Sequence, residues 1–468
     1  MTTERIHAIV GAGFSGMAVA IHLLRTLQGP VRVFLINRSL GFGRGLAYGT
    51  NSPSHLLNVP AGRMGLDPQD EGGFVEYLRS RGMPYGPADF VPRSLYGDYL
   101  ERSLLKAQAG SADGVKLELI EAEVLAIETR EPGGSPVLRL GSGRLIDATE
   151  IVLALGNFTP QPPATLSAAR WSSGALVNDV WSHGALDSLS RDAGVLLVGT
   201  GLTAYDAVLR LLDQGHRGAI HMLSRRGLLP QPHREQETPP APGIVQADFL
   251  AGEGSLRRQL RAVRELVRSA VEAGHDWRDV IGGLRPHTPR LWQQLGLRAR
   301  GQFVRHLLPY WDTHRHRAAP AIFRRIRGAM ESGQLGVLQG RLVDAANRPD
   351  GDVLVTWKPR SAIRHASAVY GAVINCTGPS GDLRRVREPL IEQLRASGAL
   401  SVDPLALGLH VDDDYRLLGL DGAPHDAIRY VGPLLKARLW EATAVPELRI
   451  HARNVARLLA ERASRTPA

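Results

Sequence analysis

The fold of this chain is decided by Ile6-His-Ala-Ile-Val-Gly-Ala-Gly-Phe-Ser-Gly16, an apolar run followed by three spaced glycines. The apolar run predicts a buried parallel strand, and residues 17–27 after the glycines predict a helix. Gly11 allows the tight turn, Gly13 lets the backbone approach a pyrophosphate, and Gly16 lets the helix pack on the strand. Because the first N–H groups of such a helix are free, they can meet phosphates. A bound dinucleotide is therefore expected here.

A second stretch repeats this arrangement far downstream. Val195–Val198 is a short apolar run, and Gly199-Thr-Gly201-Leu-Thr-Ala204 follows it, with alanine in the third small position. Two such units predict an α/β chain with two Rossmann-like dinucleotide-binding domains. A flavin reduced by a nicotinamide is the usual pair of dinucleotides, so a redox enzyme is expected. The alternative for each loop is a glycine turn without a ligand.

Composition narrows the class of protein. The chain has 468 residues, of which 43% are hydrophobic and 22% charged, as expected for a globular protein of two or three domains. Its one cysteine, Cys376, excludes a dithiol reductase that would need a cysteine pair within the chain. It also excludes an internal disulfide, which favours a reducing cytoplasm.

The net charge of +10 leaves several partners open. A basic surface could attract nucleic acid or acidic lipids, but no nucleic-acid motif is recognisable, so arginines that bind cofactor phosphates are the favoured reading. Ile6–Leu24 lacks Lys, Arg, Asp and Glu, and Ala18-Val-Ala20 resembles a signal-peptidase site. Cleavage there would remove the first glycine loop, so we expect a cytoplasmic protein without a membrane span.

The ends of the two second strands indicate which dinucleotide each unit prefers. Asn37 follows the strand Val31–Ile36, where an acidic residue would chelate both ribose hydroxyls; an amide bonds them more weakly. The strand at 219–223 instead runs into Ser224-Arg225-Arg226. Arginine there matches a 2′-phosphate, so the second nucleotide is predicted to be NADPH rather than NADH. The alternative is a generic basic turn.

The chain resembles the bacterial FAD/NAD(P)-binding proteins related to flavin-dependent monooxygenases. The resemblance spans almost the whole length and depends on several motifs beyond the two glycine loops. They are Gly43-Arg-Gly-Leu-Ala-Tyr48, Leu56-Leu-Asn-Val-Pro60, Ser224-Arg-Arg-Gly-Leu-Leu-Pro230, Leu307–Arg317, Asn375-Cys-Thr-Gly378, Gly432-Pro433 and Trp440–Arg449. Asn37 departs from the acidic residue usual in that group.

This resemblance implies roles for residues by position. The first loop would face the FAD pyrophosphate, Arg44 and the loop from Asn58 to Met64 would run near the flavin ring or its phosphates, and Val124 would bond adenine through its backbone. The flavin pocket would be closed by Gly378 and by the start of the last helix, whose N–H groups stabilise charge on reduced flavin. The remaining cofactor-binding assignments are Gly156, Thr443, Ala444 and Val445.

The domains are predicted from these units. Residues 1–165 and 365–468 form a discontinuous FAD-binding domain, and residues 190–252 and 335–364 form an NADPH-binding domain. A proline-rich crossing is expected at 230–242. Residues 253–334 form a helical insert that would serve as a lid over the substrate.

Three features of the chain have open interpretations. Trp171 and Trp181 are either a degenerate form of a monooxygenase signature or two tryptophans that pack a domain seam. His306, His314 and His316 lack the carboxylates or cysteines of a metal site, so no metal is expected. Three arginines of the insert either bind an anionic substrate or form a solvated basic face: Arg305, Arg315 and Arg317.

Three functions follow, with the catalytic residues left unknown. The first is an NADPH-dependent flavin monooxygenase that forms a flavin C4a-hydroperoxide and oxygenates a small substrate with O2, by N-hydroxylation or a Baeyer–Villiger reaction. The second is an NADPH-dependent flavin reductase or dehydrogenase that passes electrons to a quinone or protein. The third is a flavin-binding scaffold with a basic surface.

Overall fold

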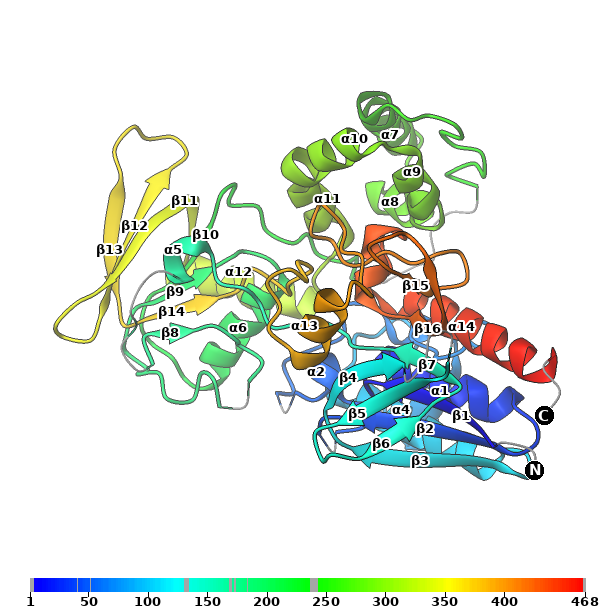
Figure 1. Cartoon of the computed structure of the whole chain (residues 1–468). Helices are drawn as coiled ribbons and strands as arrows, with labels where there is room; N and C mark the ends of the chain where they lie inside the picture. The colour runs from blue at the N-terminus through cyan, green and yellow to red at the C-terminus, as the bar shows by residue number, and fades with distance from the viewer. Residues whose placement is uncertain are drawn as a thin grey trace.

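The structure, a computed structural model, describes residues 4–39, 41–50, 52–129, 134–167, 171, 174–182, 184–235 and 243–465. Two α/β bodies are visible in it, together with a group of helices coloured green (Figure 1). Within the described ranges, one sheet has six strands, a second has seven and a third has three. The predicted α/β class, with two Rossmann-like domains and a helical insert, is confirmed.

The first fingerprint lies at the centre of the first sheet. β1 (Arg5–Val10) pairs in parallel with β2 (Val31–Asn37) on one side and with β7 (Glu150–Leu153) on the other. Because these strands run in parallel, their carboxyl ends share one edge, which is where such sheets bind dinucleotides. The outer strands are β3 (Val115–Glu121), β16 (Pro424–Tyr430) and the antiparallel β15 (Arg416–Leu418).

Helix α1 (Phe14–Thr26) leads away from that edge and is buried over most of its length. Its sequence is apolar on nearly every face, as expected for a helix covered on both sides. It packs against α4 (Arg93–Ala109) and the last helix, α14 (Val445–Arg465). The C-terminal helix therefore completes the first domain. Two shorter helices precede α4, namely α2 (Gly45–Tyr48) and α3 (Gly73–Ser80).

The second sheet repeats this arrangement around β9 (Val195–Val198). β10 (Ile220–Ser224) and β14 (Ala372–Asn375) flank β9 in parallel, and α6 (Leu202–Asp213) follows it. The other strands are β8 (Leu176–Val177), which is parallel to β14, and β11 (Leu335–Asn347), β12 (Val353–Pro359) and β13 (Ala366–Tyr370), which form a long meander.

Two predicted boundaries differ from the structure. The apolar run at 369–375 is divided at Gly371: β13 ends at Tyr370, and β14 pairs with β9 inside the second sheet. The predicted boundary at 365 therefore lies before these two strands rather than after them. Helix α12 (Pro320–Glu331) packs Ile322 and Ile326 into the core of the second domain, so the insert ends before it. In the proline-rich crossing, residues 236–242 lie outside the described residues.

The insert proper is a bundle of short helices. Its members are α7 (Leu256–Glu272), α8 (Trp277–Leu284), α9 (Thr288–Gln294), α10 (Leu297–Gln302), a π-helical turn at Phe303–Leu307 and α11 (Leu308–Arg315). The longest, α7, is amphipathic: Val263, Leu266 and Val267 pack into the bundle, and most of its arginines lie on the outer face.

The remaining strands form a small meander on the first domain: β4 (Val124–Thr129), β5 (Pro136–Leu140) and β6 (Leu145–Asp147). Helix α13 (Pro389–Ala396) packs on β4, and Gln393 bonds both the N–H and the C=O of Ile127. In the portion of the chain that the structure covers, no helix has both the length and the apolar character of a membrane span.

Candidate functional site

The three glycines of the first loop have different surroundings. A Cβ at Gly11 would lie 2.3 Å from the oxygen of Ala154, and one at Gly16 would lie 1.9 Å from the oxygen of Gly11. The protein itself fills these two positions. A Cβ at Gly13 would meet nothing within 4 Å, and Gly13 is the N-cap of α1. The loop is therefore closed toward the protein and open at the one position where a pyrophosphate would approach.

Asn37 and Val124, separate in the sequence, line one cavity of about 110 Å³ beside this loop. The amide of Asn37 is engaged: Oδ1 accepts from Ala12 N–H at 3.2 Å, and Nδ2 donates to the carbonyl of Ser39 at 2.7 Å. Gly156 lies between Leu155 and Asn157, and both of these line the same cavity. The structure thus brings Asn37 and Val124, assigned to the ribose and to adenine, to one cavity, with Gly156 at its edge.

Glu388 is a residue of this cavity that sequence reasoning missed. It precedes α13, more than 300 positions from Asn37, and its carboxylate lies 3.2 Å from the Arg38 guanidinium. The carboxylate absent from the end of β2 is therefore supplied to the cavity by a distant segment.

The structure differs from the prediction that Arg44 runs near the flavin ring or its phosphates. Its segment does lie beside the loop, because the N–H of Gly43 donates to Ala12 at 2.8 Å. The guanidinium, however, is paired with Asp98 and Glu101 of α4, both at 2.7 Å. These carboxylates occupy the donors that a cofactor phosphate would need.

The sequence analysis assigned the flavin to the start of α14 and to the loop that contains Asn58 and Met64, and we call this part of the first domain its flavin side. The backbone N–H groups of Ala444 and Val445 have no acceptor within the described residues, as expected for a helix start. Thr443, just before them, bonds Glu441 through its N–H. Asn58 accepts a bond at its carbonyl from His233, at 3.1 Å.

Arg63 follows Asn58 in that loop and adds positive charge near the start of α14. Burial, together with the nearby Arg285 and Arg315, lowers the pKa of Arg63 to about 10, and Glu447 and Glu71 oppose this shift. Met64, next to it, is fully buried. The sequence analysis assigned the flanking residues of this loop but not its arginine.

The second loop has the same design as the first. A Cβ at Gly199 would lie 2.3 Å from the oxygen of Cys376, whereas one at Gly201, the N-cap of α6, would meet nothing within 4 Å. Ala204 is fully buried at the third small position. Gly378 follows Cys376, whose carbonyl faces Gly199, and Ser380 just beyond it donates at 3.3 Å to the carbonyl of Phe158, a lining residue of the first-domain cavity.

The basic turn after β10 separates two arginines that the sequence analysis treated alike. Arg225 is exposed and makes no hydrogen bond or ion pair with any described residue. Arg226 lies over the ring of Tyr310 in α11, 5.2 Å from its centroid. Ser224 holds the turn, since its hydroxyl accepts from Gly227 N–H and from Thr200, both at 3.0 Å.

The two domains meet at a buried ion pair. Arg93 of α4 lies 3.0 Å from Asp206 of α6, and both side chains are less than a tenth exposed. The Arg93 guanidinium also lies over the ring of Trp181, at 5.5 Å from its centroid. Trp181 thus packs the seam, as one of the two predicted alternatives has it, whereas Trp171 packs inside the second domain and donates to Leu166 at 2.7 Å.

The insert is joined to the first domain through Glu441, which lies in the turn before α14. Trp311 donates to its carboxylate at 2.6 Å, and Arg315 lies 2.8 Å from it. Burial favours the neutral acid, but Arg315, His316 and Trp311 outweigh it and lower the pKa of Glu441 to about 2. Its backbone φ of 75° is a conformation that costs free energy away from glycine.

These contacts also place the three arginines proposed for substrate binding. Arg315 is committed to Glu441 and lies 3.7 Å from Glu447, so its charge is balanced inside the protein. Arg305 is exposed on the π-helical turn, and its carbonyl accepts from Arg226. Arg305, Arg315 and Arg317 do not line the large cavity that the described part of the insert contains.

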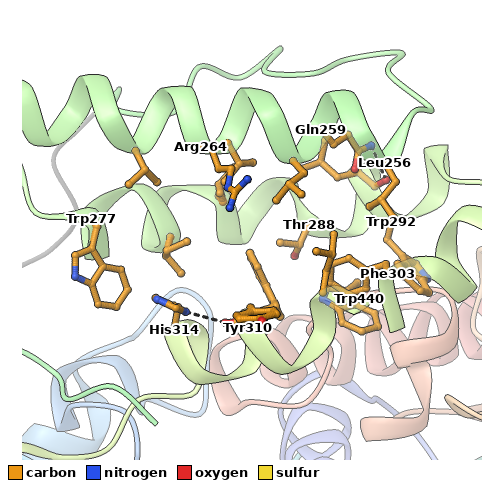
Figure 2. Close-up of a pocket in the computed structure, with 18 of the residues that line it drawn as sticks. Leu256, Gln259, Arg264, Trp277, Thr288, Trp292, Phe303, Tyr310, His314 and Trp440 are labelled. Carbon is orange, nitrogen blue, oxygen red and sulfur yellow. Dashed lines mark hydrogen bonds between the residues drawn. The ribbon is translucent and has the colours of Figure 1, made fainter. Parts of the chain in front are cut away.

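That cavity has a volume of about 820 Å³ and lies within the bundle. Figure 2 shows α7 above it and α11 below it, with aromatic side chains at both ends. We call it the insert chamber. Its aromatic lining residues are Trp277, Trp292, Phe303, Tyr310, Trp311 and Trp440.

The histidines and the cysteine of the chain form no further site in the described residues. Among those residues, no group of three or more His, Cys, Asp or Glu side chains is placed to hold a metal ion. His314 is bonded to the carbonyl of Tyr310 at 2.8 Å, and burial lowers the pKa of His316 to about 4. Burial also raises the pKa of Cys376.

Comparison with known proteins supports this geometry at the level of domain and fold. Residues 8–158 match the model of a family described as FAD-NAD(P)-binding. No curated protein is significantly similar to the chain in sequence. The matched range contains the first glycine loop with the N-terminus of α1, which we call the first cradle; the second loop with the N-terminus of α6 is the second cradle. The matched range also contains β2 with Asn37, and the strand that ends before Gly156.

Solved structures match nearly the whole chain. The L-lysine 6-monooxygenase of Pseudomonas syringae is 17% identical with a TM-score of 0.65, covering 98% of this chain and 99% of that one. The ornithine N-hydroxylase of Kutzneria sp. 744, solved with reduced FAD, NADP⁺ and L-ornithine, is 17% identical with a TM-score of 0.64, covering 99% and 100%. The thioredoxin reductase of Lactococcus lactis is 13% identical with a TM-score of 0.51, covering 98% of each chain. The likeness is one of fold, and it confirms the predicted resemblance to two-dinucleotide flavoproteins.

Proposed function

We propose that this protein is an FAD-dependent oxidoreductase that uses NADPH. The observation that carries the proposal is the pair of cradles. In each, the first glycine is packed against its own protein, and the middle glycine at the helix N-cap is open. A loop that only turned the chain would not need an open glycine at that position in both domains.

The identity of each nucleotide is supported by the residues around its cradle. The FAD-NAD(P)-binding match covers the first cradle, and α14 brings the free N–H groups of Ala444 and Val445 to the same domain. In the second cradle, the exposed and unpaired Arg225 at the end of β10 suits a 2′-phosphate. We therefore assign FAD to the first cradle and NADPH to the second.

Within this class, we infer a monooxygenase. Three observations support this reading: the fold similarity to amine N-hydroxylases, the single buried Cys376, and a large, mostly apolar chamber whose lining includes Trp440, just before α14. A reductase of the thioredoxin reductase type would need a second cysteine, which the chain lacks.

Bound FAD would supply the redox chemistry, taking two electrons from NADPH and passing them to oxygen. The chain's own residues would position and shield it. The open N-terminus of α1 would bind the pyrophosphate, and the N–H groups of α14 with Arg63 would stabilise negative charge on the ring. The Arg93–Asp206 pair would hold the two cradles in a fixed relation. The apolar insert would exclude water.

The test is a pair of turnover measurements on the FAD-loaded protein. We expect NADPH oxidation in air to depend on oxygen and to be faster than with NADH. If a soluble quinone supports faster NADPH oxidation without oxygen than air does, the reductase reading replaces the monooxygenase. A protein that binds FAD but oxidises neither nicotinamide would leave only the scaffold.

A further inference from the structure

The insert chamber presents apolar surface even where its residues carry polar atoms. Trp292 donates its indole N–H to Ala437 at 2.9 Å, and Trp311 donates to Glu441. Thr288 donates to Arg285 at 2.9 Å, and Gln259 donates to Glu253 at 2.7 Å. Because these polar atoms are bonded inside the protein, these four residues offer a ligand mainly ring and hydrocarbon surfaces.

The permanent charge on the side chains that line the chamber is positive. None of its lining side chains, all of them described residues, is a carboxylate. Arg264 is its one arginine, and no described residue forms a hydrogen bond or ion pair with it. Figure 2 shows Arg264 directed from α7 toward the chamber. A cationic ligand would find no counter-charge there, whereas an anion would find a guanidinium.

The chamber is also next to the flavin side. Trp440 lines it, and the following residue is Glu441, which anchors Trp311 of the opposite wall. Five residues after Trp440, Val445 begins α14, the helix whose N-terminus we assign to the flavin. A molecule in the chamber would therefore approach the cofactor along the segment from Trp440 to Val445.

From these observations we infer that the insert chamber binds a bulky aromatic anion, whose rings lie among the tryptophans and whose anionic group pairs with Arg264. The role of this molecule as the substrate rests on the proposed function, although its binding does not. A volume of about 820 Å³ suits a multi-ring molecule better than a short amine. The substrate class thus differs from the amines named for the similar structures.

The test uses three probes on the FAD-loaded protein. These are 1-anilinonaphthalene-8-sulfonate, an aromatic anion; N-phenyl-1-naphthylamine, its neutral counterpart; and cadaverine, a dication. Fluorescence titration should show one saturable site for each aromatic probe, with tighter binding of the sulfonate. Cadaverine should displace neither probe.

Variants locate the site. Arg264→Gln should weaken sulfonate binding by about tenfold, the value of one charged hydrogen bond, and change binding of the neutral probe by less than about twofold. Val267→Phe, which fills the chamber from α7, should weaken both by about tenfold or more. The matched control is Arg268→Gln, an exposed arginine of the same helix that does not line the chamber, and it should change neither.

Other results would overturn the inference. If cadaverine displaces a probe, or if Arg264→Gln and wild type bind both probes equally well, the chamber does not select an anionic group through Arg264. Binding that Val267→Phe leaves unchanged removes the chamber as the site, provided that the variant keeps its FAD and its melting temperature. Reduction of the FAD by NADPH is measured separately, so its failure would reject the proposed function and leave the probe result standing.

Discussion

The two nucleotide cradles share a backbone and differ at the end of the second strand. Gly13 and Gly201 are both open N-caps, and Gly11 and Gly199 are both packed against the neighbouring strand connection. At the strand ends, however, the Asn37 side chain is hydrogen-bonded to the loop, whereas the Arg225 side chain is exposed. From this comparison we expect the loop to determine that a dinucleotide binds, and the strand end to determine which one.

The largest effect is expected at Gly16, where the start of α1 packs against the backbone of the first glycine loop. Gly16→Ala would place a Cβ 1.9 Å from the backbone oxygen of Gly11, an atom that cannot move without the strand. We expect a loss of at least about 3 kcal/mol in the free energy of unfolding, or no folded protein. Urea denaturation followed by tryptophan fluorescence measures it. A variant as stable as wild type would show that the third glycine is not a packing position.

The next largest effect is expected at Glu441, which joins the insert to the domain of the first cradle. Glu441→Gln should cost about 3 kcal/mol near neutral pH, because it leaves Arg315 buried with weaker compensation. The folded-state pKa of Glu441 is about 2 against an ordinary 4.5, so its stabilisation is present above pH 4.5 and is lost as the pH falls toward 2. The gap between wild type and variant should close over that window.

The control for this anchor is an exposed pair on the same last helix. Glu461→Gln breaks the ion pair with Arg457 and should change stability by less than about 1 kcal/mol at any pH. Urea titrations at a series of pH values compare the two variants. A gap for Glu441→Gln that stays constant between pH 7 and pH 3 would contradict the assigned ionisation.

The open glycines allow a matched exchange between the cradles. Gly13→Ala and Gly201→Ala each add a methyl group to empty space, so both variants should fold. The first should weaken FAD by at least about tenfold and leave NADPH unchanged, and the second should do the reverse. Calorimetric titration of each nucleotide measures both. Equal losses of both nucleotides in one variant would break the assignment of one cradle to each.

A smaller effect is expected at the second strand end. Arg225→Gln should raise the KM for NADPH by about tenfold and leave that for NADH unchanged, because the guanidinium contacts only the 2′-phosphate. Arg226→Gln should have a weaker effect, about threefold, because its side chain is already stacked on Tyr310. Steady-state kinetics with both coenzymes decide. Equal effects on NADH would reject the phosphate contact.

The smallest effect is expected at Asn37. Asn37→Asp supplies a charged acceptor for the ribose and for Ala12 N–H, but loses the donation to Ser39. FAD should bind more tightly by less than about tenfold, with NADPH unaffected. Fluorescence quenching of added FAD measures the change. Weaker binding would show that Glu388, already in the cavity, is the ribose carboxylate and repels a second one.

Local signals explain why the cradles could be predicted. Gly11, Gly13 and Gly16 are set by backbone sterics within one turn, and those rules are written in the sequence. The same holds for the strands on either side. The boundary at 365 was wrong because a continuous apolar run does not reveal that Gly371 divides it between an antiparallel meander and a parallel strand.

Long-range pairing explains what could not be predicted. The family resemblance assigned Arg44 to the cofactor, and an anionic substrate was one of two alternatives for Arg315. In the structure, Glu101 and Glu441 pair with these arginines from distant segments. Glu388, Arg93 and Arg264 carry no motif at all. Their roles depend on which elements the fold brings together, and only the three-dimensional arrangement contains that information.

The measurement that tests the account most directly is anaerobic reduction of the FAD-loaded protein, followed by the visible absorption of the flavin. The account predicts a yellow protein that NADPH bleaches much faster than NADH, with the preference abolished in Arg225→Gln. A colourless protein that takes up no FAD when it is supplied in excess would contradict it.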